Sequence, residues 1–197
     1  MQAKFLAVQW MTDFADQSVV MPVSCVMLLF FGLARWKRGV VVWFATIVGT
    51  LSVMLLLKLG IGACGWELGL RRLNSPSGHT ASATVLYGSL LSVLFPRVSM
   101  RATMIAAGLI ALAFAISRLF LHDHTVPEVL IGAAVGFCAV FSFRFLVGPV
   151  PDALRLFWMM AAILMVMVVT HGHRLPAEQQ VHSFAITELR ARLCPSH

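Results

Sequence analysis

Two histidines stand beside residues that could orient a nucleophile or bind an anion. His79 ends the tetrapeptide Pro76-Ser77-Gly78-His79, and His124 lies four residues before Glu128. On a helix, that spacing lets the carboxylate of Glu128 accept a hydrogen bond from Nδ1 of His124. The bond would fix the tautomer of the imidazole and leave Nε2 to act as a nucleophile. The spacing therefore predicts that His124 is a nucleophile oriented by Glu128.

A structural role for Glu128 is the alternative. Thr125 and Glu128 have the spacing of a capping box, and Pro127 suits the first turn of a helix. One carboxylate can fill both roles. His122 and Asp123 are expected to flank the nucleophile at the rim of the site.

The segment Ser77-Gly78-His79 is expected to begin a helix. The N–H groups at a helix start favour an anion, and glycine lets the backbone approach it closely. Taken alone, the segment is explained more simply by an N-cap at Ser75 or Ser77. Four basic residues complete the set, namely Lys58, Arg71, Arg72 and Arg118. These four residues would form a phosphate clamp if they lie at the same end of the protein. Whether they do depends on the elements that carry them.

The composition of the chain indicates a membrane protein. Of its 197 residues, 59% are hydrophobic and 12% are charged, and the mean hydropathy is +0.88. Soluble domains have about 45–50% apolar and about 25% charged residues, so a soluble enzyme, a disordered chain and a secreted disulfide scaffold are disfavoured. The net charge of +7 does not indicate a nucleic-acid partner, because the cations fall between apolar runs.

The apolar runs predict an all-α, polytopic membrane helix bundle. A span needs about 20 residues, and six runs fit, at 17–34, 39–59, 79–96, 102–121, 127–147 and 153–171. Residues 1–16 are expected to form a short interfacial helix, and the polar tail 172–197 a short helix around 177–193. Residues 1–197 then make one domain with 17–171 as its transmembrane core. The Gly132–Gly136 pair predicts close helix packing.

The distribution of Lys and Arg predicts the orientation. One set of loops holds tight clusters, as cytoplasmic loops do, at Arg35, Lys37, Arg38, Arg97, Arg101, Arg144 and Arg155. Both termini and loop 60–78 would then face outward, together with the residues suited to chemistry. Charged residues are costly near lipid and usually functional there, so the cations at this face favour the phosphate clamp over snorkelling.

The four cysteines show neither a CxxC pair nor a metal-ligand spacing. Cys25 and Cys138 lie in apolar runs, where a cysteine acts as a small hydrophobic residue. Cys64 and Cys194 lie outside the runs. The sequence leaves open whether these two form a disulfide.

The motifs together resemble the type 2 phosphatidic acid phosphatase superfamily, which also includes vanadium haloperoxidases. Its signature has the parts Lys-x6-Arg-Pro, Pro-Ser-Gly-His and Ser-Arg-x5-His-x3-Asp. The second part is residues 76–79, and the third is Ser117-Arg118, five residues, His124, three residues and then Glu128 in place of the usual Asp. The first part keeps Lys58, but twelve or thirteen residues separate it from Arg71 or Arg72. The resemblance covers about residues 50–145.

The resemblance implies a mechanism and a site. Phosphate would be held by Lys58, Arg71 or Arg72, Ser77, the Gly78 amide and Arg118. His124 would form a phosphohistidine, Glu128 would orient it, and His79 would protonate the leaving oxygen and then activate water. The resemblance implies neither a cofactor nor a metal.

The predicted function is that of an integral membrane lipid phosphatase in the bacterial cytoplasmic membrane, with its site facing the periplasm or the outside. Its partners would be membrane lipids and a lipid phosphate: undecaprenyl diphosphate, phosphatidylglycerol phosphate, phosphatidic acid or a lipid A phosphate. A haloperoxidase is disfavoured because those enzymes are usually larger and soluble. The alternative from another class is a non-catalytic transporter or scaffold that keeps the anion site. The two histidines favour the enzyme, because a binder needs neither a general acid nor a nucleophile.

Overall fold

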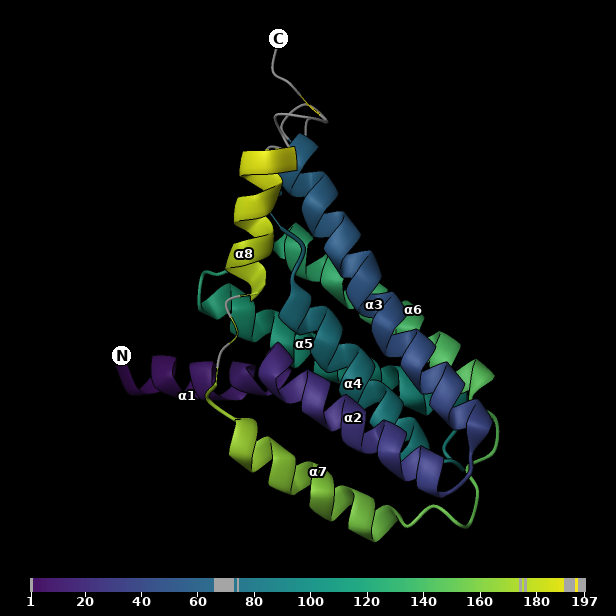
Figure 1. The fold of residues 1–197 in the computed structure, drawn as a ribbon. Helices are drawn as coiled ribbons and strands as arrows, with labels where there is room; N and C mark the ends of the chain where they lie inside the picture. The colour runs from purple at the N-terminus through teal and green to yellow at the C-terminus, as the bar shows by residue number, and fades with distance from the viewer. Residues whose placement is uncertain are drawn as a thin grey trace.

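Every regular element in the part that the structure describes is a helix (Figure 1). This computed structural model describes residues 2–65, 73, 75–173, 175, 177–189 and 194. Its elements are α1 (Gln2–Thr12), a 3₁₀ turn (Asp13–Ala15), α2 (Gln17–Leu33), α3 (Lys37–Cys64), α4 (Gly78–Leu94), α5 (Met100–Phe120), α6 (Val126–Leu146), α7 (Leu156–Thr170), α8 (Ala177–Phe184) and a π-helical turn (Ala185–Leu189). The predicted all-α class is confirmed. Arg71 and Arg72 lie outside the described residues.

Helices α2 to α7 correspond in order to the six predicted spans. Four segments are long and apolar enough to cross a membrane, and α7 is a shorter apolar helix. The four are Lys4–Leu33, Lys37–Cys64, Met100–Phe120 and Val126–Leu146. Helix α3 has 28 residues, or about 42 Å at 1.5 Å per residue. Because a bilayer core is about 30 Å thick, we expect the Cys64 end of α3 to extend beyond it.

Apolar side chains also cover the outside of the bundle, as lipid contact requires. On α5, Ile105, Leu109, Leu112 and Ile116 are each more than half exposed. Their spacing of four, three and four residues places them in one stripe along the helix. In water such a stripe would be costly, but against hydrocarbon it has no such cost.

Helix α4 is the centre of the bundle, packed against α5 and α6. Most of its side chains are buried, and many are small or carry a hydroxyl. Two of these hydroxyl groups bond within the helix, that of Thr84 to the Thr80 carbonyl at 2.7 Å and that of Ser92 to the Gly88 carbonyl at 3.1 Å. Small residues let membrane helices approach closely.

The predicted packing role of the glycine pair on α6 is confirmed. A Cβ at Gly132 would lie 2.3 Å from the backbone oxygen of Ser77, and one at Gly136 would lie 2.6 Å from Cβ of Thr84. Both glycines therefore face α4 at a distance that no side chain fits. The contact at Gly132 holds the start of α4 against α6.

The end of the bundle away from Cys64 is tied by arginines. Nε of Arg38 donates to the Leu146 carbonyl at 2.6 Å, and Arg144 donates to the carbonyls of Pro96 and Val98 at 2.7 and 2.9 Å. Cations favour the carbonyl ends of helices, which carry partial negative charge. The clusters predicted to be cytoplasmic therefore meet at one end.

The N-terminal helix α1 projects from the bundle (Figure 1). Its apolar side chains Phe5, Leu6 and Trp10 are exposed, as expected of a helix that lies in a membrane interface. The turn that follows it is different, because Asp13 and Asp16 are buried. Asp16 caps α2, with Oδ1 accepting a hydrogen bond from the Ser18 N–H at 2.8 Å.

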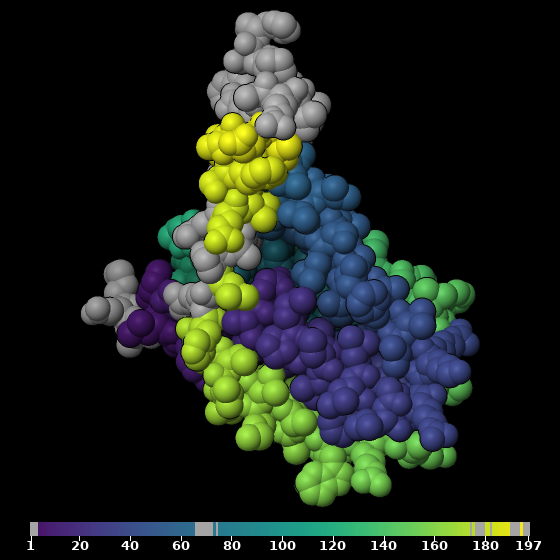
Figure 2. Space-filling view, viewed as in Figure 1, coloured from purple at the N-terminus to yellow at the C-terminus, as the bar shows by residue number. Residues whose placement is uncertain are grey.

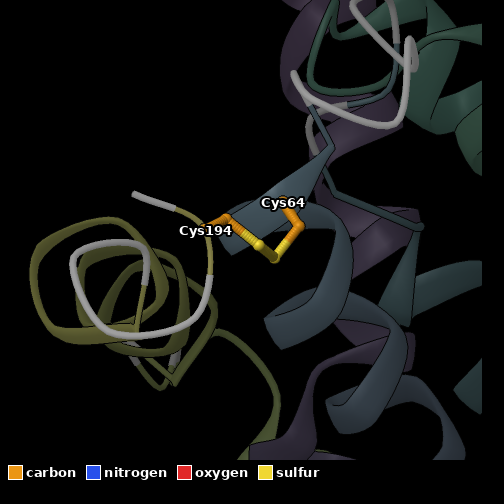
Figure 3. The surroundings of a disulfide bond; sticks show 2 residues. All are labelled: Cys64 and Cys194. Atoms are coloured by element: carbon orange, nitrogen blue, oxygen red, sulfur yellow. A yellow bond between two sulfur atoms is a disulfide. The ribbon is translucent and has the colours of Figure 1, made fainter. Parts of the chain in front are cut away.

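The C-terminal segment lies along the projecting end of α3. Helix α8 runs beside α3 (Figures 1 and 2), and Cys194 forms a disulfide with Cys64 at the last residue of α3 (Figure 3). The two Cα atoms are 5.5 Å apart, and 130 residues separate the cysteines in sequence. The structure thus answers a question that the sequence left open. The helix predicted around 177–193 is present as α8 and the π-helical turn.

The close approach of α4 and α6 leads to a stability prediction. We expect Gly132→Ala to lower the free energy of unfolding by about 1–3 kcal/mol, because the methyl group overlaps the Ser77 oxygen and the helices must separate. Gly49→Ala on α3 is the matched control. A Cβ there meets no atom within 4 Å, and alanine favours a helix by about 1 kcal/mol over glycine. Thermal unfolding in detergent compares the two variants, and wild-type stability of Gly132→Ala would contradict the packing described here.

Candidate active site

The carboxylate of Glu128 is the hub of a hydrogen-bonded cluster at the start of α6. Oε2 accepts a bond from the Thr125 N–H at 2.8 Å and lies 3.1 Å from Nδ1 of His124. Oε1 accepts a bond from the Ser75 N–H at 3.1 Å. The side chains of Glu128 and His124 are only 3% and 6% exposed. Glu128 therefore caps α6 and contacts His124 at once, so the geometry of both predicted roles is present.

The backbone of Glu128 holds the Pro-Ser-Gly-His segment. Its carbonyl accepts a bond from the Ser77 N–H at 3.0 Å. The Ser77 hydroxyl lies 3.0 Å from Oγ1 of Thr80 and accepts a bond from the Thr80 N–H at 3.4 Å. Ser77 is thus the N-cap of α4, as the simpler interpretation of the segment predicted. Gly78 and His79 follow as the first residues of α4.

Lys58 and Arg118 reach this end of the bundle from α3 and α5, and both are buried. Nζ of Lys58 donates to Oγ of Ser75 at 3.2 Å. The Arg118 guanidinium pairs with Asp123, whose Oδ2 lies 3.0 Å away. Asp123 was predicted only to flank the nucleophile, and the structure gives it a cation as partner. His122 is exposed and has a left-handed backbone with φ of 58° in the turn between α5 and α6.

A cavity of about 140 Å³ adjoins the cluster. Polar groups from three elements line part of it, including Asp16, Lys58, Gly78 and His79. Apolar residues line the rest, including Leu51, Met54 and Leu55 of α3 and Leu175 and Val181 of the C-terminal segment. A molecule with a charged head and an apolar body has the matching chemistry.

Asp16 lies beside His79, a contact that the sequence did not predict. Its Oδ2 lies 3.8 Å from Nε2 of His79, and the two side chains are 8% and 17% exposed. The sequence predicts an interfacial helix over residues 1–16 and no role for Asp16. The available signal was an acidic residue directly before an apolar span, with Ser18 two positions later.

The structure brings most of the predicted site residues together. Hydrogen bonds or ion pairs join Lys58, Ser75, Ser77, Glu128 and His124 into one cluster. His79 follows Ser77 at the start of α4, and Arg118 lies in the last turn of α5. Arg71 and Arg72 cannot be placed, because they lie outside the described residues. Within the described part of the chain, no group of three or more His, Cys, Asp or Glu residues is arranged to hold a metal ion.

Comparison with known proteins agrees with this arrangement. A family model described as the PAP2 superfamily matches residues 62–149. A protein of Klebsiella pneumoniae described as "Uncharacterized 22.5 kDa protein in cps region" is 26% identical over 189 residues, which cover 90% of this chain and 89% of that protein. No solved structure matches the chain significantly. The resemblance that the motifs predicted is confirmed for residues 62–149, which hold both histidines.

The three bonds to the Glu128 carboxylate lead to a prediction for its amide variant. We expect Glu128→Gln to lower kcat by about 10²–10⁴-fold, the usual contribution of a positioned acid–base group. We also expect a loss of about 1–3 kcal/mol in stability, because one amide oxygen cannot accept from Ser75, Thr125 and His124 together. Phosphate release and thermal unfolding measure the two effects.

Two further variants make this test specific. Glu188→Gln makes the same chemical change at an exposed position and is expected to leave both quantities unchanged. Glu128→Asp retains the charge and the usual family residue, so it should keep measurable activity. Near-normal kcat in Glu128→Gln would show that Glu128 is a cap only.

Proposed function

We propose, on the premise that residues 62–149 belong to the PAP2 superfamily, that this chain is an integral membrane phosphatase that hydrolyses a phosphate monoester or diphosphate on a lipid. Members of this superfamily are generally phosphatases, and the apolar helices support a multi-pass membrane protein. The observation that carries the proposal is the Glu128 cluster. It joins the histidine expected to attack phosphorus to the segment expected to bind phosphate.

In the first half-reaction, Nε2 of His124 attacks phosphorus while Glu128 holds Nδ1 on the other side of the ring. The new P–N bond forms as the P–O bond to the leaving group breaks, and His79 gives its proton to the leaving oxygen. Lys58, Arg118, Ser77 and the Gly78 N–H bind the phosphoryl oxygens, and Arg71 or Arg72 adds a further cation. Such charge stabilisation is the main requirement of phosphoryl transfer.

In the second half-reaction, water attacks the phosphohistidine. The neutral His79 takes a proton from that water as the new P–O bond forms and the P–N bond breaks. The products are free phosphate and the starting forms of both histidines. The negative charge of Glu128 stabilises His124 whenever its ring is cationic.

A lipid substrate is supported by the surroundings of the site. The cavity beside His79 has polar groups and apolar walls, and exposed apolar side chains surround the bundle. A lipid can therefore present its phosphate from the bilayer while its chains stay among apolar groups. The candidate substrates are undecaprenyl diphosphate, phosphatidylglycerol phosphate, phosphatidic acid and a lipid A phosphate.

An outward-facing site in the bacterial cytoplasmic membrane is supported by two features. The arginine-rich end lies opposite the site, as the positive-inside rule favours. The disulfide Cys64–Cys194 lies beyond Lys58 on the same helix. Disulfides persist in oxidising compartments such as the periplasm and are rare in the cytosol. The two arguments are independent and point to the same side.

The proposal leads to a prediction for the purified protein. We expect it to release phosphate from at least one of the four candidate lipids in the presence of EDTA, because Lys and Arg supply the positive charge. His124→Ala and His79→Ala should each reduce release by at least about 10²-fold. The histidines lie at a bundle end, so both variants should still fold. Malachite green detection of phosphate and thermal unfolding measure these outcomes.

Three results would count against parts of this proposal. Loss of activity in EDTA that Mg²⁺ restores would contradict the clamp of basic residues. A large residual activity in His124→Ala would contradict the assigned nucleophile. Specific binding of lipid phosphates without any release would indicate the non-catalytic alternative, an anion-binding transporter or scaffold.

The orientation leads to a labelling prediction. In a Cys25→Ala, Cys138→Ala background, which keeps the disulfide, single cysteines replace the exposed residues His173 and Asp152. We expect an impermeant thiol reagent to label position 173 but not position 152 in spheroplasts, because only the first shares an end with the site. In the background itself, an impermeant reductant should expose two thiols, those of Cys64 and Cys194. Labelling at position 152 alone would invert the orientation.

A further inference from the structure

We propose that Asp16 is a positioning residue for His79, which it keeps protonated for transfer of a proton to the leaving group. This inference rests on the proposed function, in which His79 is the general acid. It extends the site to the N-terminal part of the chain, outside residues 62–149. The turn Asp13–Ala15 and α2 both pack against α4, whose second residue is His79.

The carboxylate of Asp16 is fixed by the backbone. Oδ1 accepts bonds from the N–H groups of Ser18 at 2.8 Å and Leu175 at 3.4 Å. The other oxygen, Oδ2, lies 3.8 Å from Nε2 of His79. One oxygen thus holds the side chain while the second faces the imidazole. A separation of 3.8 Å is within ion-pair distance for a protonated imidazole, and catalytic contacts commonly tighten when substrate binds.

The charges around the cavity explain why His79 needs an acidic partner. Lys58 of α3 lines the same cavity, and the Glu128–His124 pair at the start of α6 belongs to the adjoining cluster. Arg118, in the last turn of α5, pairs with Asp123, and Asp13 is buried in the turn that packs against α4. The cations that bind phosphate disfavour a second positive charge on a nearby imidazole. Asp16 is the carboxylate that faces His79 from α2, and it offsets this repulsion.

Each histidine would then have a carboxylate partner, but on opposite nitrogens of the ring, so the proton that His79 transfers is the one on Nδ1. His124 has Glu128 at 3.1 Å from Nδ1, and His79 has Asp16 at 3.8 Å from Nε2. When the P–O bond breaks, the imidazolium of His79 passes its proton to the leaving oxygen and becomes neutral. When water attacks the phosphohistidine, His79 regains a proton from that water. Asp16 lines the cavity beside His79 but neither gives nor takes a proton in these steps.

The variant Asp16→Asn separates this role from helix capping. Asparagine caps helices as well as aspartate does, and its carbonyl oxygen can still accept from Ser18 and Leu175. Only the charge that faces His79 is lost. We expect kcat at neutral pH to fall by at least about tenfold, part of the 10²–10⁴-fold effect of a general acid, with KM changed by less than about threefold.

The pH profile and the leaving group supply readouts that a structural role would not change. Without the carboxylate, the imidazolium loses its proton at lower pH, so the alkaline limb of the kcat profile should move to lower pH. An aryl phosphate such as p-nitrophenyl phosphate needs little protonation of its leaving oxygen. For that substrate, Asp16→Asn should lose far less activity than for an alkyl phosphate.

Asp152→Asn is the matched control, because it makes the same change at an exposed residue at the opposite end of the bundle. Wild-type kcat, an unmoved pH profile and no leaving-group dependence in Asp16→Asn would overturn the inference. If Asp16→Asn does not fold, Asp16→Ser, which also caps helices, undergoes the same comparison with the charge-retaining Asp16→Glu. Absence of phosphate release by the wild-type protein would instead overturn the proposed function, so the two failures are distinguishable.

Discussion

The buried carboxylate of Glu128 is the constraint on which the site depends. A charge that is only 3% exposed is costly unless hydrogen bonds satisfy it. Here the backbone supplies two of those bonds, from Thr125 and Ser75, and the His124 ring lies at a third position. The same bonds that stabilise the charge therefore fix the start of α6, the approach to α4 and the orientation of the imidazole. Removing the charge would release all three.

The closeness of α4 and α6 provides the geometry for that carboxylate. Gly132 lies one helical turn beyond Glu128 and leaves room for the Ser77 backbone oxygen. Ser77 in turn donates its N–H to the Glu128 carbonyl. In lipid, association of helices depends on packing and on bonds between polar groups, because apolar surface gains little by leaving hydrocarbon. A small residue and a buried polar network at one crossing satisfy both requirements.

Most of the fold could be predicted from the sequence because lipid permits so few backbone structures. The six apolar runs correspond to α2 through α7, but α3 continues past the predicted end near residue 59 to Cys64, through Gly60 and Gly62, whose low helix propensity gives no sign of a continuing helix. The contacts of Arg118 with Asp123 and of His79 with Asp16 were not predicted. They depend on the rotation of whole helices about their axes and on how a turn packs. The motifs predicted candidate residues and one local partner, Glu128 for His124, whereas the partners of Arg118 and His79 follow from the folded arrangement.

The glutamate that replaces the usual aspartate has a physical rationale in this structure. Residue 128 is the third residue of α6, the position at which a capping box requires Glu or Gln. Its side chain turns back to the Thr125 N–H, and this places Oε2 beside His124 and Oε1 beside Ser75. An aspartate, one methylene shorter, would have to give up part of this set of contacts. The replacement is therefore compatible with an oriented histidine, because the longer side chain combines the cap with the contact to His124.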